Sequence, residues 1–331
     1  MAAGVPPDAW GLTHGTRGMG EVKMRGSVVV LGIFVADTAY RAARQPSLGE
    51  TILGTGFHLG PGGKGSNQAV AAAMAGGRVH FISRLGRDPF ADMARATWAR
   101  AGVIPEITVD ADSYTGAAFI FVEDATGNNA IIVSPGAAGG LSAADVDLRA
   151  GLVGSAAVFV TQLEQPIAAA RRGLQIAREG GARTVLNPAP AADIADGMLA
   201  LCDVVTPNES EAEGLTGLPV RSLADAERAA DALLARGVGA AIVTLGAAGA
   251  LHRDRRRSVH VPAFDAGPVV ETTGAGDAFN GAFATALAEG ADPVEATRFG
   301  CAAASLSVTR PGAAAAMPAR HEIEALLAGG R

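Results

Sequence analysis

From residue 155 onward, the sequence alternates short apolar runs, rich in β-branched residues, with longer helical stretches. The apolar runs lie at 157–161, 184–186, 204–206 and 241–245. The helical stretches among them include 167–179, 209–216 and 224–236. Strands that alternate with helices form parallel sheets buried on both faces. We therefore predict an α/β fold: a three-layer α/β/α sandwich with a mostly parallel central sheet.

The N-terminal part of the chain adds strands of two kinds. The runs at 27–31 and 79–83 are mostly apolar and fit the central sheet, whereas 116–122 and 130–133 flank a polar turn and predict a hairpin. We expect a small β-sheet lid, formed by about 36–61 and 113–136, inserted into one large domain at 27–331. The Gly- and Pro-rich residues 1–26 are interpreted as a flexible N-terminal tail.

Composition excludes several functional classes. The chain is 49 % hydrophobic and 18 % charged, with a net charge of −6 and no basic stripe, so a nucleic-acid partner is not expected. Its two cysteines, Cys202 and Cys301, are far apart, which suits a reducing cytoplasm. No apolar run approaches the roughly 20 residues of a membrane helix, so no membrane partner is expected.

A first glycine motif, Gly-Pro-Gly-Gly-Lys-Gly-Ser-Asn, occupies 60–67. It formally matches G-x-G-x-x-G, but it does not follow the first strand directly and lacks an acidic residue about 20 positions later, so it is a weak dinucleotide signal. It is not a P-loop, because Gly65 stands where Ser or Thr must follow Lys. A tight turn before a helix explains the glycines; a site for sugar hydroxyls or an anion explains Lys64 and Asn67 as well. Lys64 is one of only two lysines, the other being Lys23.

A second glycine motif covers Glu-Thr-Thr-Gly-Ala-Gly-Asp-Ala-Phe-Asn-Gly at 271–281, before an apolar helical stretch. Small residues at a helix N-terminus leave amide groups free to face a phosphate. Asp277 has two interpretations: an acid that favours the first helical turn, or a general base beside phosphate-binding amides. The motif alone does not choose between them.

Both motifs together resemble the two signatures of the PfkB-type carbohydrate kinases. Gly-Gly-Lys-Gly-Ser-Asn-Gln-Ala-Val-Ala at 62–71 is similar to the N-terminal signature, and Thr-Gly-Ala-Gly-Asp-Ala-Phe-Asn-Gly at 273–281 to the C-terminal one. They lie about 210 residues apart, in the family's order. Shorter stretches support the resemblance: Gln162-Leu163-Glu164, Asn187-Pro188-Ala189-Pro190 and Thr206-Pro207-Asn208-Glu209.

The resemblance implies transfer of the ATP γ-phosphate to a sugar hydroxyl with Mg²⁺, and it is strongest to members that phosphorylate D-ribose at O5. It implies that Asp277 is the general base and that the amides of Gly274, Ala275 and Gly276 form the anion hole. The sugar contacts that it implies come from Asp37, Gly63, Lys64, Gly65, Ser66, Asn67, Glu164 and Asp277.

The nucleotide and cation sites also follow from the resemblance. Asn208 and Glu211 match the family's Asn-x-x-Glu element, which serves Mg²⁺-bound water and phosphate; a helix cap explains both residues equally. The nucleotide side is implied to contain Asn208, Thr244, Leu245, Gly246, Ala247, Ala248, Gly249, Gly276 and Cys301, although helix packing also accounts for Cys301. A K⁺ site is implied near Glu271, Thr273, Ser307, Arg310 and Gly312.

Two departures from the family pattern bear on the substrate and the cation. Val35 stands where members that act on ribose commonly have Asn, and Val cannot hydrogen-bond a hydroxyl. Glu271 replaces the Asp of the K⁺ site and is one methylene longer. Another pentose, a ketohexose or a nucleoside therefore stays open as substrate, and a non-catalytic sugar or nucleotide sensor and a dinucleotide-dependent oxidoreductase remain the alternatives of other classes.

The resemblance also implies how copies of the chain assemble. The lids of two subunits would pack together in a homodimer. Apolar residues on both faces of the lid, Phe119 with Phe121 and Ile120 with Val122, fit an uncovered sheet that needs such a partner.

Overall fold

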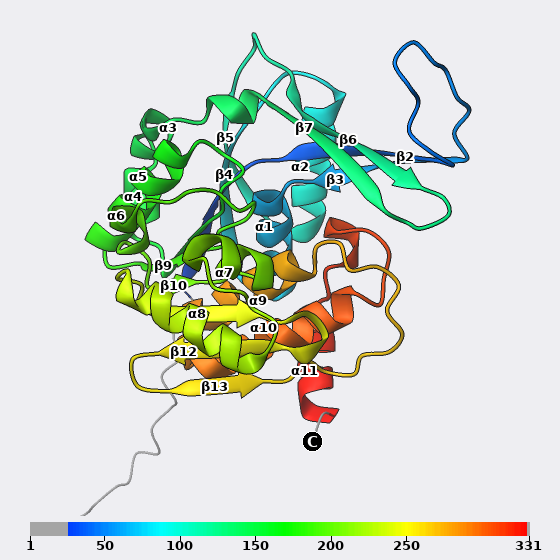
Figure 1. The fold of residues 1–331 in the computed structure, drawn as a ribbon. Coiled ribbons are helices and arrows are strands. Elements are labelled where there is room, and N and C mark those ends of the chain that lie inside the picture. The colour runs from blue at the N-terminus through cyan, green and yellow to red at the C-terminus, as the bar shows by residue number, and fades with distance from the viewer. Residues whose placement is uncertain (1–25, 330–331) are drawn as a thin grey trace, which may run out of the picture.

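The computed structural model describes residues 26–329, and a nine-stranded sheet forms its centre (Figure 1). The strands are β1 (Ser27–Leu31), β4 (Arg78–Leu85), β5 (Ile104–Val109), β8 (Val158–Thr161), β9 (Arg183–Leu186), β10 (Val204–Val205), β11 (Ala240–Thr244), β12 (Ala250–Asp254) and β13 (Ser258–Val261). Their order is β13-β12-β11-β10-β9-β8-β1-β4-β5. Neighbours from β11 to β5 pair in parallel, while β12 is antiparallel to both of its neighbours.

Helices cover both faces of this sheet, and alternate residues of each strand face opposite layers. In β1, Val28 and Val30 join one apolar core, and Val29 and Leu31 join the other. The first core includes side chains of α1 (Lys64–Met74), α2 (Pro89–Ala101), α9 (Ala275–Ala288) and α10 (Pro293–Ser307). The second includes α3 (Ala143–Asp147), α4 (Ala150–Gly154), α5 (Ile167–Glu179), α6 (Asp196–Leu199), α7 (Glu209–Thr216) and α8 (Leu223–Ala235). The last helix, α11 (Arg320–Gly329), packs through Ile323 against α9 and α10.

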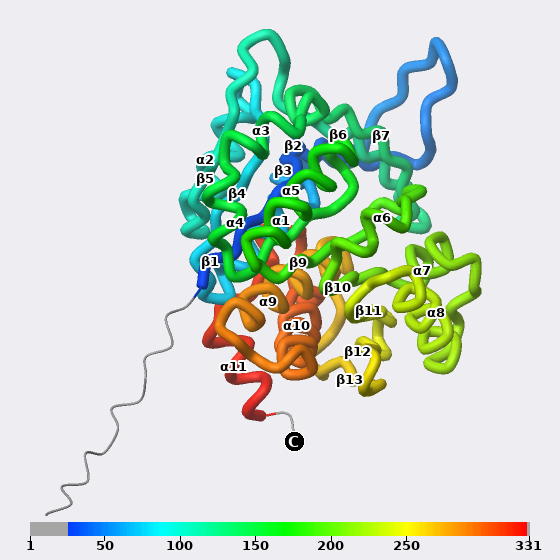
Figure 2. Tube along the Cα trace, turned by 90° about the vertical axis from the view of Figure 1, so that its left-hand side faces the viewer, coloured from blue at the N-terminus to red at the C-terminus, as the bar shows by residue number. Residues whose placement is uncertain are grey.

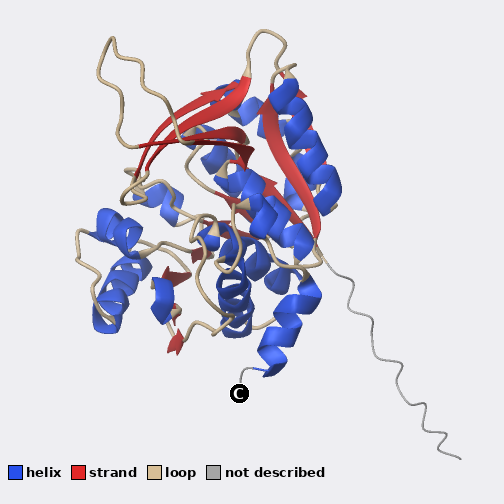
Figure 3. Ribbon diagram, turned by 90° about the vertical axis from the view of Figure 1, so that its right-hand side faces the viewer, coloured by secondary structure: helices blue, strands red, loops and turns tan. Residues whose placement is uncertain are grey.

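A second sheet of four strands lies at the other end of the molecule from α11 (Figure 2). It consists of β3 (Gly56–Gly62), β2 (Val35–Ala42), β6 (Thr115–Glu123) and β7 (Asn129–Gly136), in that order. β2 pairs in parallel with β6, and the other neighbours are antiparallel. Figure 3 shows these strands at the top of the molecule, with the β2–β3 loop extending past them. We call this sheet the lid.

The predicted three-layer sandwich with a separate small sheet is confirmed. The tail predicted at 1–26 falls, except for Gly26, outside the described residues. At the first glycine motif, β3 continues to Gly62 and α1 begins at Lys64. The single residue Gly63, at a φ of +87°, makes the turn between strand and helix. No helix within residues 26–329 is both long and apolar enough to span a bilayer.

Candidate active site

Polar side chains follow the carboxyl ends of the central parallel strands. Gln162 comes after β8, Asn187 after β9 and Thr206 after β10, and all three are buried. The carboxyl edge of a parallel sheet is where α/β proteins bind ligands, most often where strand order reverses. Here the reversal is at β1, whose neighbours are β4 and β8. The N-termini of α1 and α9 reach this edge and bring the two glycine motifs together.

Glycine is required at two adjacent positions of the first motif. A Cβ on Gly62 would lie 2.2 Å from Oδ2 of Asp37, so a side chain there would displace this carboxylate. A Cβ on Gly63 would lie 2.6 Å from the carbonyl oxygen of Ile33, and its φ of +87° also disfavours other residues. The chain can therefore pass close to Asp37 and then start α1 at Lys64.

Four carboxyl groups gather around the start of α1. Asp277 is buried at the start of α9, and Asp37, Glu164 and Glu211 lie near enough to interact electrostatically with it. Burial raises the pKa of all four groups, to about 6 for Asp37 and about 7 for Glu164. The ammonium of Lys64 opposes the pKa rise of Glu164, Glu211 and Asp277. Lys64 is thus the cation of an acidic site.

The carboxylate of Asp277 is held by two amides from α1. Asn67 Nδ2 donates to Asp277 Oδ2 at 3.1 Å, and Gln68 Nε2 donates to Asp277 Oδ1 at 3.0 Å. Asn67 Oδ1 is buried and has no hydrogen-bond partner among the described residues. A buried acceptor without a donor is costly, so this atom is suited to a ligand hydroxyl.

The N-terminus of α9 offers amide hydrogens to an anion. Gly274 caps the helix at a φ of +79°, and no acceptor within residues 26–329 is recorded for the N–H of Gly274 or Gly276. A Cβ on Gly276 would meet nothing within 4 Å, so this turn faces open space. The N–H of Ala275, by contrast, donates to the carbonyl of Thr272 at 3.2 Å. Of the three predicted anion-hole amides, two are therefore free in this conformation.

Asn208 and Glu211 form a reciprocal cap at the start of α7. Asn208 Oδ1 accepts from the Glu211 N–H at 2.8 Å, and Glu211 Oε2 accepts from the Asn208 N–H at 3.0 Å. This is the helix-cap alternative described for these residues. The Glu211 carboxyl also lies near enough to Lys64 and Asp277 for their charges to influence its pKa. The cap and a role at the site are compatible.

The predicted nucleotide residues lie beside this cap. Asn208 and Thr244 form a parallel β-bridge, and the Thr244 N–H donates to the carbonyl of Pro207 at 2.9 Å. Residues 246–248 form a short helical turn, which begins at Gly246 and is followed by Gly249; both glycines have a positive φ. Cys301 is only 4 % exposed and belongs to the apolar core of α9 and α10, which agrees with helix packing.

The segments expected to hold a monovalent cation are adjacent. Glu271 Oε2 accepts from the Gly312 N–H at 2.8 Å, and the Glu271 N–H donates to the carbonyl of Val308 at 3.1 Å. Ser307 is buried with its hydroxyl on the carbonyl of Ala304, and Arg310 is paired with Glu322. The two side chains are thus engaged, so only their backbone carbonyls are left to bind a cation.

Two predicted sugar contacts occupy positions that leave no side chain for a sugar. Ser66 is fully buried, and its hydroxyl accepts a hydrogen bond from the indole of Trp98 at 2.9 Å. Gly65 packs on Gly32, so closely that a Cβ on Gly65 would lie 2.6 Å from the Gly32 Cα. Both residues position the start of α1. Conversely, Gln68 was not among the predicted residues, although it lies four positions after Lys64 and therefore on the same helix face.

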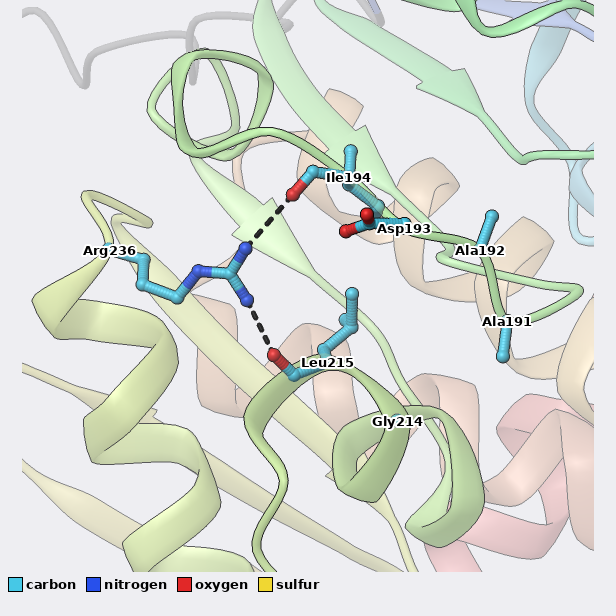
Figure 4. Close-up of a pocket in the computed structure, with 7 residues that line it drawn as sticks. All are labelled: Ala191, Ala192, Asp193, Ile194, Gly214, Leu215 and Arg236. Carbon is cyan, nitrogen blue, oxygen red and sulfur yellow. Dashed lines mark hydrogen bonds between the residues drawn. The ribbon is translucent and has the colours of Figure 1, made fainter.

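A separate cavity of about 320 Å³ lies away from these residues, between α7, α8 and the segment before α6 (Figure 4). Arg236 crosses it and donates to the carbonyls of Leu215 and Ile194, at 2.5 and 2.9 Å. Its guanidinium also pairs with Asp196. Because its donors are used in this way, Arg236 ties three chain segments together.

The fold and this edge of the sheet define the class of α/β phosphotransferases that act on a hydroxyl group. The family model for the pfkB family carbohydrate kinases matches residues 25–320, and the chain belongs to this family. The ribokinase of Haemophilus influenzae is 38 % identical over 300 residues, which cover 90 % of this chain and 97 % of that protein. The deoxyribokinase of Salmonella typhi is 35 % identical over 302 residues, covering 91 % and 98 %. The structure of Arabidopsis thaliana ribokinase complexed with ribose and ATP has a TM-score of 0.85 at 31 % identity, covering 92 % and 99 %.

Proposed function

We propose that this chain is a ribokinase, which transfers the γ-phosphoryl group of ATP to O5 of D-ribose and yields D-ribose 5-phosphate and ADP. The observation that carries the proposal is the position of Asp277. Its carboxylate lies in the first turn of α9, beside the open amides of Gly274 and Gly276, and is held by Asn67 and Gln68. Phosphoryl transfer to a hydroxyl requires a general base close to a group that binds the phosphate, and the N-terminus of α9 provides such an anion-binding group beside Asp277.

In this mechanism, Asp277 accepts the proton of the sugar hydroxyl. At the same time the sugar oxygen bonds to the γ-phosphorus, and the bond between that phosphorus and the bridging oxygen of ADP breaks. The amides at the start of α9 stabilise the charge on the transferred group, helped by the helix dipole. Lys64 supplies a positive charge among the four carboxyl groups, and so reduces their repulsion of the phosphates.

The sugar would bind between the lid and α1. Asp37 lies on the face of β2 that it shares with Ala39, toward the site, and Asn67 Oδ1 is a buried acceptor in need of a donor. Glu164 approaches from the end of β8 and accepts from the Lys64 N–H. Carboxylates and amides suit a ligand with many hydroxyls, since each hydroxyl can be paired. The lid would exclude water from the transfer.

The nucleotide would lie along Asn208 and residues 244–249, with its phosphates toward Gly276. Mg²⁺ is commonly held by one or two carboxylates together with substrate phosphates, so Glu211 is a fitting ligand through water. When bound, Mg²⁺ would neutralise charge on the phosphates.

A K⁺ ion is proposed at the junction of the loops at 271–273 and 307–312. The Glu271–Gly312 hydrogen bond ties these loops just before the anion hole, so an ion there would act on the start of α9. ADP release at fixed ribose, compared in KCl and in tetramethylammonium chloride, tests the K⁺ proposal.

We also propose that the reaction takes place in the cytoplasm, since both cysteines are free and buried.

A homodimer through the lid is supported by the sheet face that points away from the site. Tyr40, Phe57 and Phe119 contact one another there through their rings. Phe57 is 60 % exposed and Ile132, paired with Phe119, is 65 % exposed. An apolar face of this kind is typical of a surface covered by a partner.

Steady-state ADP release with ATP, Mg²⁺ and a panel of sugars tests the proposal. Ribose should give the highest kcat/KM, and omission of either ATP or Mg²⁺ should abolish turnover. A best sugar more than about tenfold ahead of ribose would replace ribose as the substrate. Calorimetric binding of ribose with no turnover at all would instead identify a sensor.

One observation favours a second candidate, 2-deoxyribose. Val35 lies two residues before Asp37 and so on the same face of β2, and it is 4 % exposed. An apolar side chain there accommodates a sugar that lacks one hydroxyl better than one that carries it. This candidate is also supported by the relative of this chain that is a deoxyribokinase. In the Val35→Asn variant, the ratio of kcat/KM for ribose to that for 2-deoxyribose should rise.

A further inference from the structure

Gln68 lies at the centre of a buried hydrogen-bond network beside Asp277. Gln68 is fully buried in α1, and all three polar positions of its side chain are engaged. Nε2 donates to Asp277 Oδ1 at 3.0 Å and to Asn187 Oδ1 at 3.1 Å. Oε1 accepts from Gln162 Nε2 at 2.6 Å. The amide therefore links the base to the ends of β8 and β9.

These partners determine which way the amide of Gln68 points. Since Gln162 donates to Oε1, a flipped amide would place N–H against N–H, and the donor edge must face Asp277 and Asn187. Asn187 is itself fixed, because its Nδ2 donates to the carbonyl of Thr206 at 3.0 Å. Gln162 can reach Gln68 because Gly32 and Gly65 carry no side chains; a Cβ on either would lie within 3 Å of Gln162 Oε1.

The same network reaches the anion hole. Thr206 Oγ1 donates to Asn280 Oδ1 at 2.6 Å, and Asn280 Nδ2 donates to the carbonyl of Gly276 at 2.8 Å. The ends of three strands thereby fix both the carboxylate of Asp277 and the adjoining turn of α9. Asp277 carries the one charge among the residues of this network, and the other residues in it are neutral.

We propose that Gln68 is a positioning residue for Asp277: its amide, oriented by Gln162 and Asn187, holds the carboxylate so that one oxygen faces the sugar hydroxyl. The inference rests on the proposed role of Asp277 as base. A carboxylate that loses one of two donors can rotate away from the hydroxyl. Hydrogen bonds to charged groups are stronger than those between neutral groups, so the loss should lower the rate.

The hydrogen bond from Gln68 also affects the pKa of Asp277. Burial raises its pKa, while Lys64, Gln68 and Asn67 lower it. The other charged groups near Asp277 are Asp37, Glu164 and Glu211, which Gln68 replacement leaves in place. Loss of the Gln68 donor should therefore move the acid limb of the kcat–pH profile to higher pH.

The test uses Gln68→Met, which keeps the length of the side chain but has no amide. We expect kcat to fall roughly 10- to 100-fold, corresponding to the loss of one hydrogen bond to a charge. KM for sugar and ATP should stay within about twofold, and the acid limb should shift upward. Gln162→Met removes the donor that orients Gln68 but leaves the Gln68 amide in place, so it should give a smaller fall in kcat and a smaller pH shift in the same direction. It serves as the second variant if Gln68→Met does not fold.

The matched control is Thr285→Val. Thr285 is another fully buried polar residue that joins α9 to α1, through a 3.0 Å hydrogen bond to the carbonyl of Ala72, and it does not touch Asp277. This variant should keep the wild-type pH profile. If it loses activity in the same way as Gln68→Met, packing between the helices explains both.

A double-mutant cycle separates this inference from the proposed function. In an Asp277→Ala background, Gln68→Met should cause no further loss, because its target is gone. An equal loss in both backgrounds, or an unchanged kcat and pH profile in the single variant, overturns the inference. Undiminished turnover in Asp277→Ala itself overturns the role of Asp277 instead.

Discussion

The backbone N–H of Lys64 donates a 2.7 Å hydrogen bond to Oε2 of Glu164, which lies 100 residues further along the chain. Lys64 is the first residue of α1, and its N–H is one of those that a helix cannot satisfy internally. Glu164 thus binds the helix end through its oxygen and attracts the ammonium of the same residue. This contact fixes the first glycine motif relative to the end of β8.

We expect Lys64→Arg to raise the KM for sugar severalfold while thermal stability changes little. The main-chain contact with Glu164 is retained in this variant, but the larger planar guanidinium cannot occupy the space of a compact ammonium among Glu164, Glu211 and Asp277. Initial rates at varied sugar, and a thermal melt, measure the two effects. Arg100→Lys, at an exposed position of α2, is the control and should leave both quantities unchanged. A wild-type KM in Lys64→Arg contradicts the proposed role.

Asp277→Ala should lower kcat by about 10²–10⁴, the usual cost of losing a general base. Asp92→Ala provides the control, since Asp92 also lies in the first turn of a helix but is exposed. If Asp277 only favoured helix formation, the two variants would behave alike, with a small change in stability and full turnover.

Glu164→Gln should stabilise the sugar-free protein at neutral pH. Burial raises the pKa of Glu164 from 4.5 to about 7, so the folded state holds this proton more firmly than the unfolded state. The free energy of unfolding therefore falls as pH rises from about 4.5 to 7, and stays reduced above that. Gln removes this penalty, which is about 3 kcal/mol for the full shift in pKa.

Urea unfolding at pH 3 and pH 8 checks this expectation. The variant should be more stable than the wild type at pH 8, and the difference should vanish near pH 3, where the wild-type carboxyl is protonated in both the folded and the unfolded state. Glu179→Gln, at an exposed end of α5, should show no such pH dependence. A variant less stable than the wild type at pH 8 would show that the bond from Lys64 outweighs the cost of burial.

Phe57→Ser should weaken self-association. Phe57 contributes one of three contacting rings to the outward face of the lid, and its loss removes apolar area from that surface. Sedimentation velocity over a concentration range should find a larger monomer fraction than in the wild type. Leu148→Ser, at a site that is 79 % exposed after α3, is the matched apolar control. A wild-type protein that sediments as a monomer throughout contradicts the lid dimer.

The fold could be predicted from sequence because strand and helix periodicity are local. The orientation of side chains within the glycine motif could not. Ser66 and Asn67 are neighbours in α1, yet a helix rotates about 100° per residue, so one meets Trp98 and the other Asp277. Nor does sequence pair Gln68 with Gln162, 94 residues away. Such contacts depend on the register of strands that only the three-dimensional structure fixes.

The packing of α1 against α9 has a consequence for the order of events during synthesis. The first glycine motif precedes Asp277 by about 210 residues, and the parallel strands of the central sheet also come before Asp277 in the chain. A nascent chain can form β1, β4 and the lid, yet Gln68 and Asn67 have no carboxylate to hold until α9 has emerged. Turnover would then arise abruptly, late in translation, and serve as a reporter of completed folding. Because distant contacts form slowly, the lag before activity appears would measure closure of this long loop.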